Sequence, residues 1–128
     1  PEGIRYTLNV LYDRYHLPLY IVENGVGLDE NLDENGTIED DFRIHYITEH
    51  VKNVDLAIED GVDCRGYLYW GPIDVVSAGT GEMKKRYGFV YVDRFNDGHG
   101  TLERAKKKSY DFMKELCESN GESVLGNE

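Results

Sequence analysis

The chain has 128 residues, of which 40% are hydrophobic and 30% are charged, and its formal net charge at pH 7 is −11. This composition is typical of a globular protein and excludes a disordered chain, and the length suffices for one domain with a modest core. The excess of acids argues against non-specific nucleic-acid binding, and no apolar run approaches the roughly 20 residues that a membrane span requires. A small anionic ligand is not excluded, because a local basic pocket can exist on an acidic protein.

The first pattern along the chain predicts a helix over residues 4–15. Apolar side chains recur there at helical spacing, at Ile4, Leu8, Leu11 and Tyr12. The segment His16-Leu17-Pro18 follows, and we expect the helix to end there, because the residue before a proline is displaced from the α region.

Residues 19–22 predict a strand that is buried on both faces, as the strands of parallel sheets are. Glu23 follows this strand directly, and Asn24-Gly25 then turns the chain. A carboxylate at the carboxyl end of a buried parallel strand lies where α/β proteins place their chemistry. The alternative is an acid that only solvates the end of the strand.

Residues 24–40 predict a long polar loop, and a loop of this length is uncommon unless it is a lid or a binding loop. Asp40 or Asp41 then caps a long helix that ends at Gly61. The predicted buried face of this helix comprises Ile47, Val51, Val54 and Ile58.

A second strand is predicted over residues 64–70, and it ends at Trp70. An irregular stretch follows over residues 71–83. The basic run Lys84-Lys85-Arg86 then leads into an extended segment, residues 87–92.

The last pattern predicts an amphipathic helix with Lys106-Lys107-Lys108 on its solvent side. Residues 119–121 close this helix, and we expect the tail to Glu128 to be frayed. The side chains that define the apolar face are Leu102, Ala105, Ser109, Phe112, Met113 and Leu116.

The order of these elements is helix, strand, helix, strand, helix, which is the pattern of a parallel α/β protein. Two principal strands cannot make a closed sheet. We therefore expect the chain to be the end of a larger α/β fold whose earlier strands are absent.

No metal-ligand cluster, nucleotide-binding loop or redox motif occurs in the sequence, so we expect no metal and no cofactor. His45 and His50 lack the spacing of metal ligands, and packing or surface roles are favoured for them. Cys64 and Cys117 follow no disulfide pattern, which favours reduced thiols in a cytoplasmic protein. No signal peptide is visible at the start of the chain. The start also lacks a methionine and leads directly into a helix, which again indicates a piece of a longer chain.

Glu23 and Trp70 form the first candidate site, because both lie at one rim if the two strands are parallel neighbours. A carboxylate beside a flat indole suits a sugar: the ring covers the C–H face and the acid acts at the anomeric carbon. The alternative for Trp70 is a core aromatic.

Ser77, Lys85 and Tyr87 form the second candidate site. A hydroxyl, an ammonium and a phenol can donate to a dianion with no carboxylate among them to repel it. Barrel proteins often bind phosphate on the loops after their last strands. The alternative is that residues 84–86 are a solvated charge run.

The segment Tyr20-Ile21-Val22-Glu23-Asn24-Gly25 resembles the (I/V)-x-E-N-G nucleophile motif of family 1 glycoside hydrolases. Asp41-x-Arg43-x-x-Tyr46 resembles the same family, as does Gly66-Tyr67-x-x-Trp70 through Arg86-Tyr87-Gly88, which is similar to its eighth-strand segment. This resemblance covers essentially the whole chain. It implies that residues 1–128 are the C-terminal part of a (β/α)8 TIM barrel, namely its last two βα units.

The resemblance also implies roles for individual residues. Glu23 takes the role of the nucleophile in a retaining mechanism, and Trp70 lies beneath the sugar. The β-glucosidase pattern W-S-x-x-D-N-F-E-W has a glutamate and a tryptophan that hold the sugar's hydroxyls, and Ser77 and Ala78 replace them here. Serine can donate to a phosphate that glutamate would repel.

This departure, together with Lys85-x-Tyr87, resembles the 6-phospho-β-glucosidase branch of the family, with a phosphorylated β-glucoside as substrate. Lys84 is a possible substitute for Lys85. The family's acid/base lies in an Asn-Glu-Pro motif, which is absent from this sequence, so we expect the chain alone to be inactive and the remainder of the barrel to be its partner. The alternatives are a β-glucosidase or 6-phospho-β-galactosidase and, from another class, a non-catalytic sugar-phosphate-binding domain.

Overall fold

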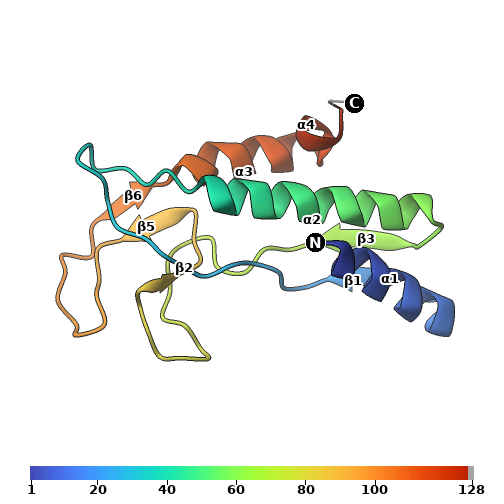
Figure 1. Ribbon diagram of the computed structural model, residues 1–128, viewed down its shortest axis with the longest axis horizontal. Helices are drawn as coiled ribbons and strands as arrows, with labels where there is room; N and C mark the ends of the chain where they lie inside the picture. Colours follow the sequence, from blue (N-terminus) through green and yellow to red (C-terminus); the bar gives the residue numbers. More distant parts are fainter. Residues whose placement is uncertain (127–128) are drawn as a thin grey trace.

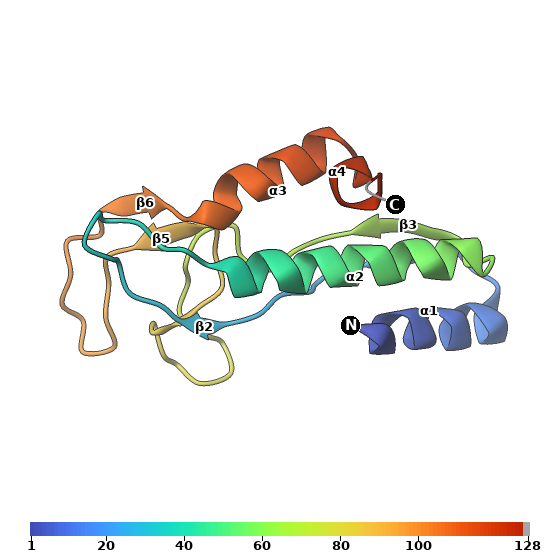
Figure 2. The same cartoon turned by 45° about the horizontal axis from the view of Figure 1, so that its top comes forward.

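The computed structural model describes residues 1–126. Figures 1 and 2 show an elongated molecule, with α1, β1 and β3 at one end, β2, β5 and β6 at the other, and α2 running between them. In chain order the elements are α1 (Glu2–Tyr15), β1 (Leu19–Ile21), β2 (Leu28–Asp29), α2 (Asp41–Glu59), β3 (Cys64–Tyr67), β4 (Lys85–Arg86), β5 (Val90–Val92), β6 (Arg104–Lys106), α3 (Lys108–Glu118) and α4 (Glu122–Leu125).

The strands β1 and β3 pair in parallel, as the sequence predicted. Helices α1 and α2 contact each other, and both contribute to the core beside this strand pair. Leu19 and Ile21 of β1 pack against a first hydrophobic cluster, which comprises Leu8, Val54, Ala57 and Val62. One face of the two-stranded sheet is therefore covered by helices.

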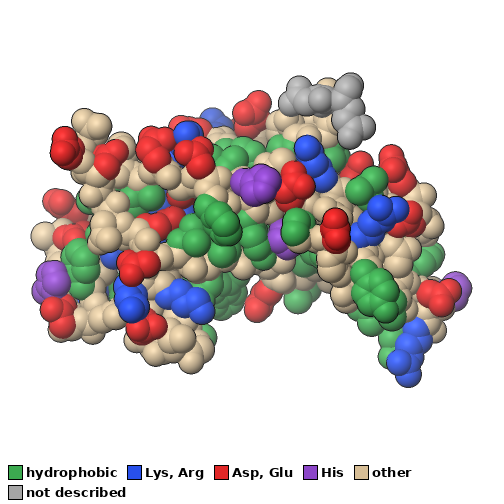
Figure 3. Space-filling view, in the orientation of Figure 1, with side chains coloured by type: hydrophobic (Ala, Val, Ile, Leu, Met, Phe, Trp, Pro, Cys, Tyr) green, Lys and Arg blue, Asp and Glu red, His purple; other side chains and the backbone are tan. Residues whose placement is uncertain are grey.

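The prediction that β1 is buried on both faces was wrong. Tyr20 is 58% exposed, and Leu68, just beyond β3 on the same face, is 50% exposed. The helices that pack on this sheet lie on one side of it, and within residues 1–126 no layer buries Tyr20 and Leu68 on the other side. Figure 3 also shows hydrophobic side chains on the outer surface of α1, where Tyr6 is 72% exposed.

The ends of the first two helices follow the sequence signals. Helix α1 stops at Tyr15, and His16 takes a left-handed conformation, with its N–H donating to the Tyr12 carbonyl at 2.8 Å. Helix α2 ends at Glu59 and is followed by Gly61, whose φ is 103°. The predicted buried face of α2 holds for Ile47 and Val54, whereas Ile58 is exposed.

The part of the molecule made of residues 24–40 and 71–107 is here called the loop assembly. Strand β2 lies within the predicted long loop and pairs antiparallel with β4, and β5 pairs antiparallel with β6. The predicted start of the last helix was wrong, because residues 104–106 form β6 and helix α3 begins only at Lys108. Pairing with β5 overrides the helical spacing there.

A second hydrophobic cluster of Ile47, Phe89 and Leu116 joins α2 and α3 to the loop assembly. The predicted frayed tail was wrong as far as Leu125, because α4 forms there, whereas residues 127–128 lie outside the described part. Cys64 and Cys117 are free thiols. Among the described residues, no helix combines the length and the apolar character that crossing a membrane demands.

Candidate active site

Glu23 and Trp70 leave neighbouring parallel strands at the same rim. Beyond the paired residues the two segments stay hydrogen-bonded, since the Leu68 N–H donates to the Ile21 carbonyl at 2.9 Å and the Trp70 N–H donates to the Asn24 carbonyl at 2.7 Å. The backbones that carry the carboxylate and the indole are therefore held side by side.

Both side chains at this rim are accessible. Glu23 is exposed and lines a cleft of about 410 Å³ with β1, the start of α1 and His50. Trp70 is 40% exposed within residues 1–126. His50 hydrogen-bonds the Tyr46 carbonyl through Nδ1 at 2.7 Å, and burial lowers the pKa of its imidazole, which favours the neutral form.

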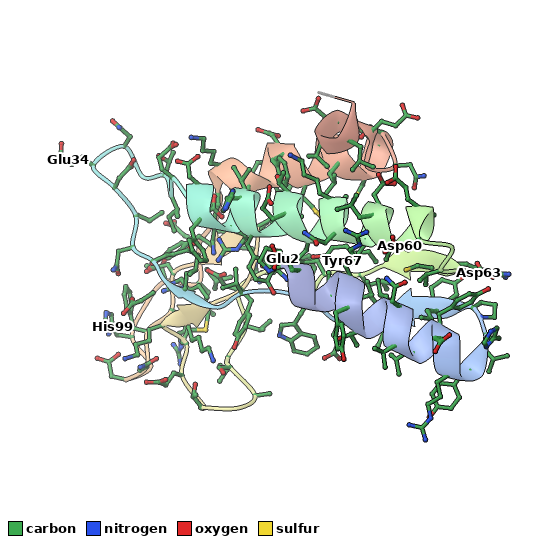
Figure 4. The ribbon with its side chains drawn as sticks, turned by 45° about the vertical axis from the view of Figure 1, so that its right-hand side comes forward. Glu2, Glu34, Asp60, Asp63, Tyr67 and His99 are labelled. Atoms are coloured by element: carbon green, nitrogen blue, oxygen red, sulfur yellow. The ribbon has the colours of Figure 1, made fainter. Side chains whose placement is uncertain are left out.

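Asn24 and Tyr67 support the rim through a hydrogen bond that the sequence analysis did not predict. The Tyr67 hydroxyl donates to Asn24 Oδ1 at 2.6 Å. Burial raises the pKa of Tyr67, so the phenol stays protonated and remains a donor. This bond fixes the residue that directly follows Glu23, and Figure 4 shows Tyr67 in the middle of the molecule, close to α1.

Ser77, Lys85 and Tyr87 lie together in the loop assembly. Ser77 is buried, and its Oγ is 3.4 Å from the Tyr87 hydroxyl. Lys85 Nζ lies 5.8 Å from the centre of the Tyr87 ring. The hydrogen bond with Ser77 and the nearby Lys85 ammonium lower the pKa of Tyr87. These three donors form one polar group, here called the donor group.

Of the two lysines considered for this position, Lys85 is the one beside Tyr87. Lys84 is exposed, and its Nζ lies 3.4 Å from Glu82 Oε1. Basic side chains are visible over the β2–β4 pair in Figure 3. The donor group also adjoins the rim, because a Cβ built on Gly71, the residue after Trp70, would lie 3.7 Å from Tyr87 Cβ.

A buried set of charged side chains, here called the charge cluster, lies between the loop assembly and the first turn of α2. It joins three acids to three bases, and the sequence analysis did not predict it. Its members are Glu30, Asp40, Arg43, Asp74, Arg86 and Lys107.

Lys107 is at the centre of this charge cluster. Its ammonium donates to Glu30 Oε2 at 2.6 Å and to Asp74 Oδ1 at 2.8 Å. The prediction that residues 106–108 lie on the solvent side of a helix was therefore wrong for Lys107, which has no exposed side-chain surface. Its bonds to two acids explain how an ammonium is tolerated there.

Arg86 was also misread in the alternative of a solvated charge run, because it is buried. Its guanidinium donates to Asp74 Oδ2 at 3.2 Å and to the Val92 carbonyl at 2.8 Å. Successive side chains of a strand point to opposite faces. Anchoring Arg86 inward therefore turns its neighbours Lys85 and Tyr87 to the other face, toward Ser77.

Asp40 acts on a different helix from the one predicted. It makes no side-chain cap bond to α2 and instead accepts a hydrogen bond from the Ser109 N–H, in the first turn of α3, at 2.9 Å. Its other oxygen binds Arg43, which also pairs with Glu30. The acid therefore ties the start of α3 to the start of α2.

Comparisons with known proteins all identify the same family. Residues 1–122 match Glycosyl hydrolase family 1. The chain is 58% identical to a 6-phospho-β-glucosidase of Clostridium longisporum, covering 97% of this chain and 27% of that protein. It is 56% identical to the aryl-phospho-β-D-glucosidase BglH of Bacillus subtilis, covering 97% of this chain and 26% of that protein. It thus spans about a quarter of the length of these relatives.

Among solved structures, the family 1 β-glucosidase of Thermotoga maritima superimposes with a TM-score of 0.84 at 34% identity, over 94% of this chain and 26% of that one. Family 1 β-glucosidases are TIM barrels, and residues 1–126 form a mixed α/β structure without a closed barrel. The predicted fold class and the predicted family are confirmed.

Proposed function

Because this chain belongs to glycosyl hydrolase family 1, we propose that it is part of a retaining glycosidase that hydrolyses 6-phospho-β-glucosides. The observation that carries the choice of substrate is the donor group of Ser77, Lys85 and Tyr87 beside the rim. It offers a hydroxyl, an ammonium and a phenol, and none of the three repels a phosphate. The relatives at 51–58% identity are named as enzymes acting on phosphorylated β-glucosides or cellobiose.

In the proposed reaction, Glu23 attacks the anomeric carbon while the bond from that carbon to the leaving oxygen breaks. A second carboxylic acid, about 5–5.5 Å away, gives its proton to the leaving oxygen. It then takes a proton from the water that releases the glycosyl-enzyme ester. The exposed Trp70 ring packs against the C–H face of the sugar.

The second acid comes from outside this chain in our proposal, because the sequence holds no Asn-Glu-Pro. We propose that residues 1–128 supply the last two βα units of a (β/α)8 barrel and that the remainder of the barrel supplies the acid/base. The same remainder would cover the open face of the β1–β3 sheet, where Tyr20 and Leu68 are exposed. The free thiols of Cys64 and Cys117 are consistent with a cytoplasmic protein.

The test is a kinetic comparison on the full-length protein. Values of kcat/KM are measured for an aryl 6-phospho-β-glucoside and for the unphosphorylated aryl β-glucoside. We expect a preference of at least about 100-fold for the phosphorylated substrate, because each hydrogen bond to a charged group contributes roughly 1.5–3 kcal/mol. Equal values for the two substrates would refute the assignment.

Ser77→Glu is the informative variant, since it places a carboxylate in the donor group. We expect the preference to collapse through a raised KM for the phosphorylated substrate. Gly79→Glu is the matched control: it adds the same charge to the same loop at an exposed position where a Cβ meets nothing within 4 Å. If Ser77→Glu and Gly79→Glu lower the preference equally, the donor group does not bind the phosphate.

A further inference from the structure

Gly27 lies against the two side chains that we assign to phosphate binding. A Cβ built on this residue would lie 2.6 Å from Lys85 Cγ, 2.8 Å from Tyr87 Cζ and 3.0 Å from Lys85 Cε. Real Cβ atoms essentially never approach heavy atoms closer than 3.0 Å. Position 27 therefore has no room for a side chain while Lys85 and Tyr87 keep their places.

The reason for glycine at this position is space and not backbone conformation. Gly27 is not among the glycines of positive φ, so alanine would suit its backbone. Gly27 therefore differs from Gly71, which combines close neighbours with a φ of 72°. A substitution at position 27 consequently acts on what surrounds it.

The two backbone segments cannot move apart easily, so a Cβ at position 27 would displace the side chains of Lys85 and Tyr87. Lys85 Cγ is near the base of its side chain, and Tyr87 Cζ is the rigid ring atom that carries the hydroxyl. Between them, Arg86 is held in the charge cluster, which fixes the strand. On the other side, β2 follows Gly27 directly, and Asp29 pairs with Lys85 in the ladder.

We propose that Gly27 determines specificity for phosphorylated substrates by positioning Lys85 and Tyr87. This inference rests on the proposed function. Because Gly27 has no side chain, the segment that carries Glu23 packs directly on the donor group. The reacting carbon and the phosphate are thereby held at a fixed spacing. A methyl group at position 27 displaces Lys85 Nζ and the Tyr87 hydroxyl, and the phosphate loses its donors.

The experiment is Gly27→Ala in the full-length protein, with Gly79→Ala as the matched control, since a Cβ at Gly79 meets nothing within 4 Å. For Gly27→Ala we expect KM for the aryl 6-phospho-β-glucoside to rise by about 10-fold or more, with a much smaller change in kcat. The inhibition constant of inorganic phosphate should rise in parallel. The preference over the unphosphorylated substrate should fall, and Gly79→Ala should retain it.

The outcomes separate this inference from the proposed function. A wild-type protein without preference for the phosphorylated substrate refutes the proposed function. A wild-type protein with this preference, and a Gly27→Ala variant that keeps it, overturns the role of Gly27 alone. An equal loss on both substrates also overturns it, because a general disturbance of the rim would then be the cause.

If Gly27→Ala does not fold, the substitution is tested in a double variant instead. Lys85→Ala with Tyr87→Ala removes the three heavy atoms nearest to a Cβ at position 27. Adding Gly27→Ala to this pair should change neither folding, followed by circular dichroism, nor the remaining substrate ratio. If the triple variant unfolds and the double variant does not, glycine is required for another reason and the proposal fails.

Discussion

The rim and the loop assembly differ in how their polar and apolar groups are satisfied. At the rim, one face of the β1–β3 sheet is open, and Tyr20, Leu68 and Trp70 are 58%, 50% and 40% exposed. In the loop assembly, Lys107 and Asp74 have no exposed side-chain surface and are paired within the chain, as is Arg43 at the start of α2. The buried charges of the loop assembly are therefore paired within this chain. The apolar side chains at the rim and on the open sheet face are instead left for another part of the protein to cover.

This difference agrees with the roles that we propose, namely reaction at the rim and phosphate binding in the loop assembly. Burying charges is expensive, and it is repaid only where each charge finds several partners in good geometry. The charge cluster meets this condition and gives Lys85 and Tyr87 a rigid base. Glu23, by contrast, is exposed and accessible for reaction.

The largest expected effect is at the rim, with Glu23→Gln in the full-length protein. If Glu23 is the nucleophile, kcat should fall by roughly 10⁴–10⁶-fold, the size of the loss when a nucleophile or its partner is removed. Binding of a phosphorylated substrate, measured by calorimetry, should persist because the donor group is untouched.

Glu34→Gln is the control for this change, because Glu34 is an exposed acid at the tip of the loop before α2 (Figure 4). It should leave turnover unchanged. A near-normal kcat for Glu23→Gln would show that Glu23 is not the nucleophile.

The next effect concerns the loop assembly, with Lys107→Met. The variant leaves Glu30 and Asp74 each without one partner inside the protein, and breaking a buried pair in this way costs about 3–5 kcal/mol of unfolding free energy. Urea titration of the full-length protein measures the loss.

Lys108→Met is the matched control, because Lys108 is the next residue and its bonds to Glu39 and Asp41 are exposed. Surface pairs of this kind contribute about 0–1 kcal/mol. Equal losses for Lys107→Met and Lys108→Met would show that the charge cluster is not the support that we infer.

The contrast between these lysines shows where sequence analysis reached its limit. Helix α1 and the strands β1 and β3 follow from local signals, such as apolar spacing and Pro18, and their parallel pairing follows from the alternation of helices and strands. Strand β2 has only two residues and exists because Leu28 pairs with Arg86, far along the chain. No local sequence pattern predicts such a pairing. For the same reason the predicted last helix wrongly included residues 104–106, which form β6.

The same limit applies to the candidate site. Ser77, Lys85 and Tyr87 were singled out by residue type and family resemblance, and they lie together, although their roles stay predictions. Lys107 looked like one of three equivalent lysines, because its partners Glu30 and Asp74 are distant in sequence. Gly27 was missed because no sequence pattern shows that Lys85 and Tyr87 fill the space where its side chain would lie.

A smaller effect tests the open face of the rim, with Leu68→Asp in the full-length protein. If the remainder of a barrel covers this face, the carboxyl group is buried without a partner, and the unfolding free energy should fall by about 3 kcal/mol. Leu32→Asp is the control, since Leu32 is 41% exposed in the loop assembly and does not have a positive φ. If both variants are tolerated equally, the β1–β3 face stays open to solvent.

The smallest effect is a pH dependence at the contact between α1 and the end of α2, where Arg5 and Asn9 of α1 bind the Asp60 carboxylate after α2 (Figure 4). The Arg5 guanidinium, followed by Asn9, lowers the pKa of Asp60 from its ordinary value of 3.8 to about 2. A depressed pKa means that the folded state favours the ionised form. The bond therefore contributes its full stability above about pH 4 and loses it as the pH falls toward 2.

Hydrogen exchange of the α1 amides reports this local loss. Below pH 4, α1 should lose protection in the wild type, and Asp60→Asn should show the weaker protection already at pH 6, with less further change on acidification. Asp13→Asn, which alters an exposed acid on α1 itself, should behave as the wild type. A wild type and an Asp60→Asn variant with the same pH profile would mean that α1 is held by its apolar contacts with α2 alone.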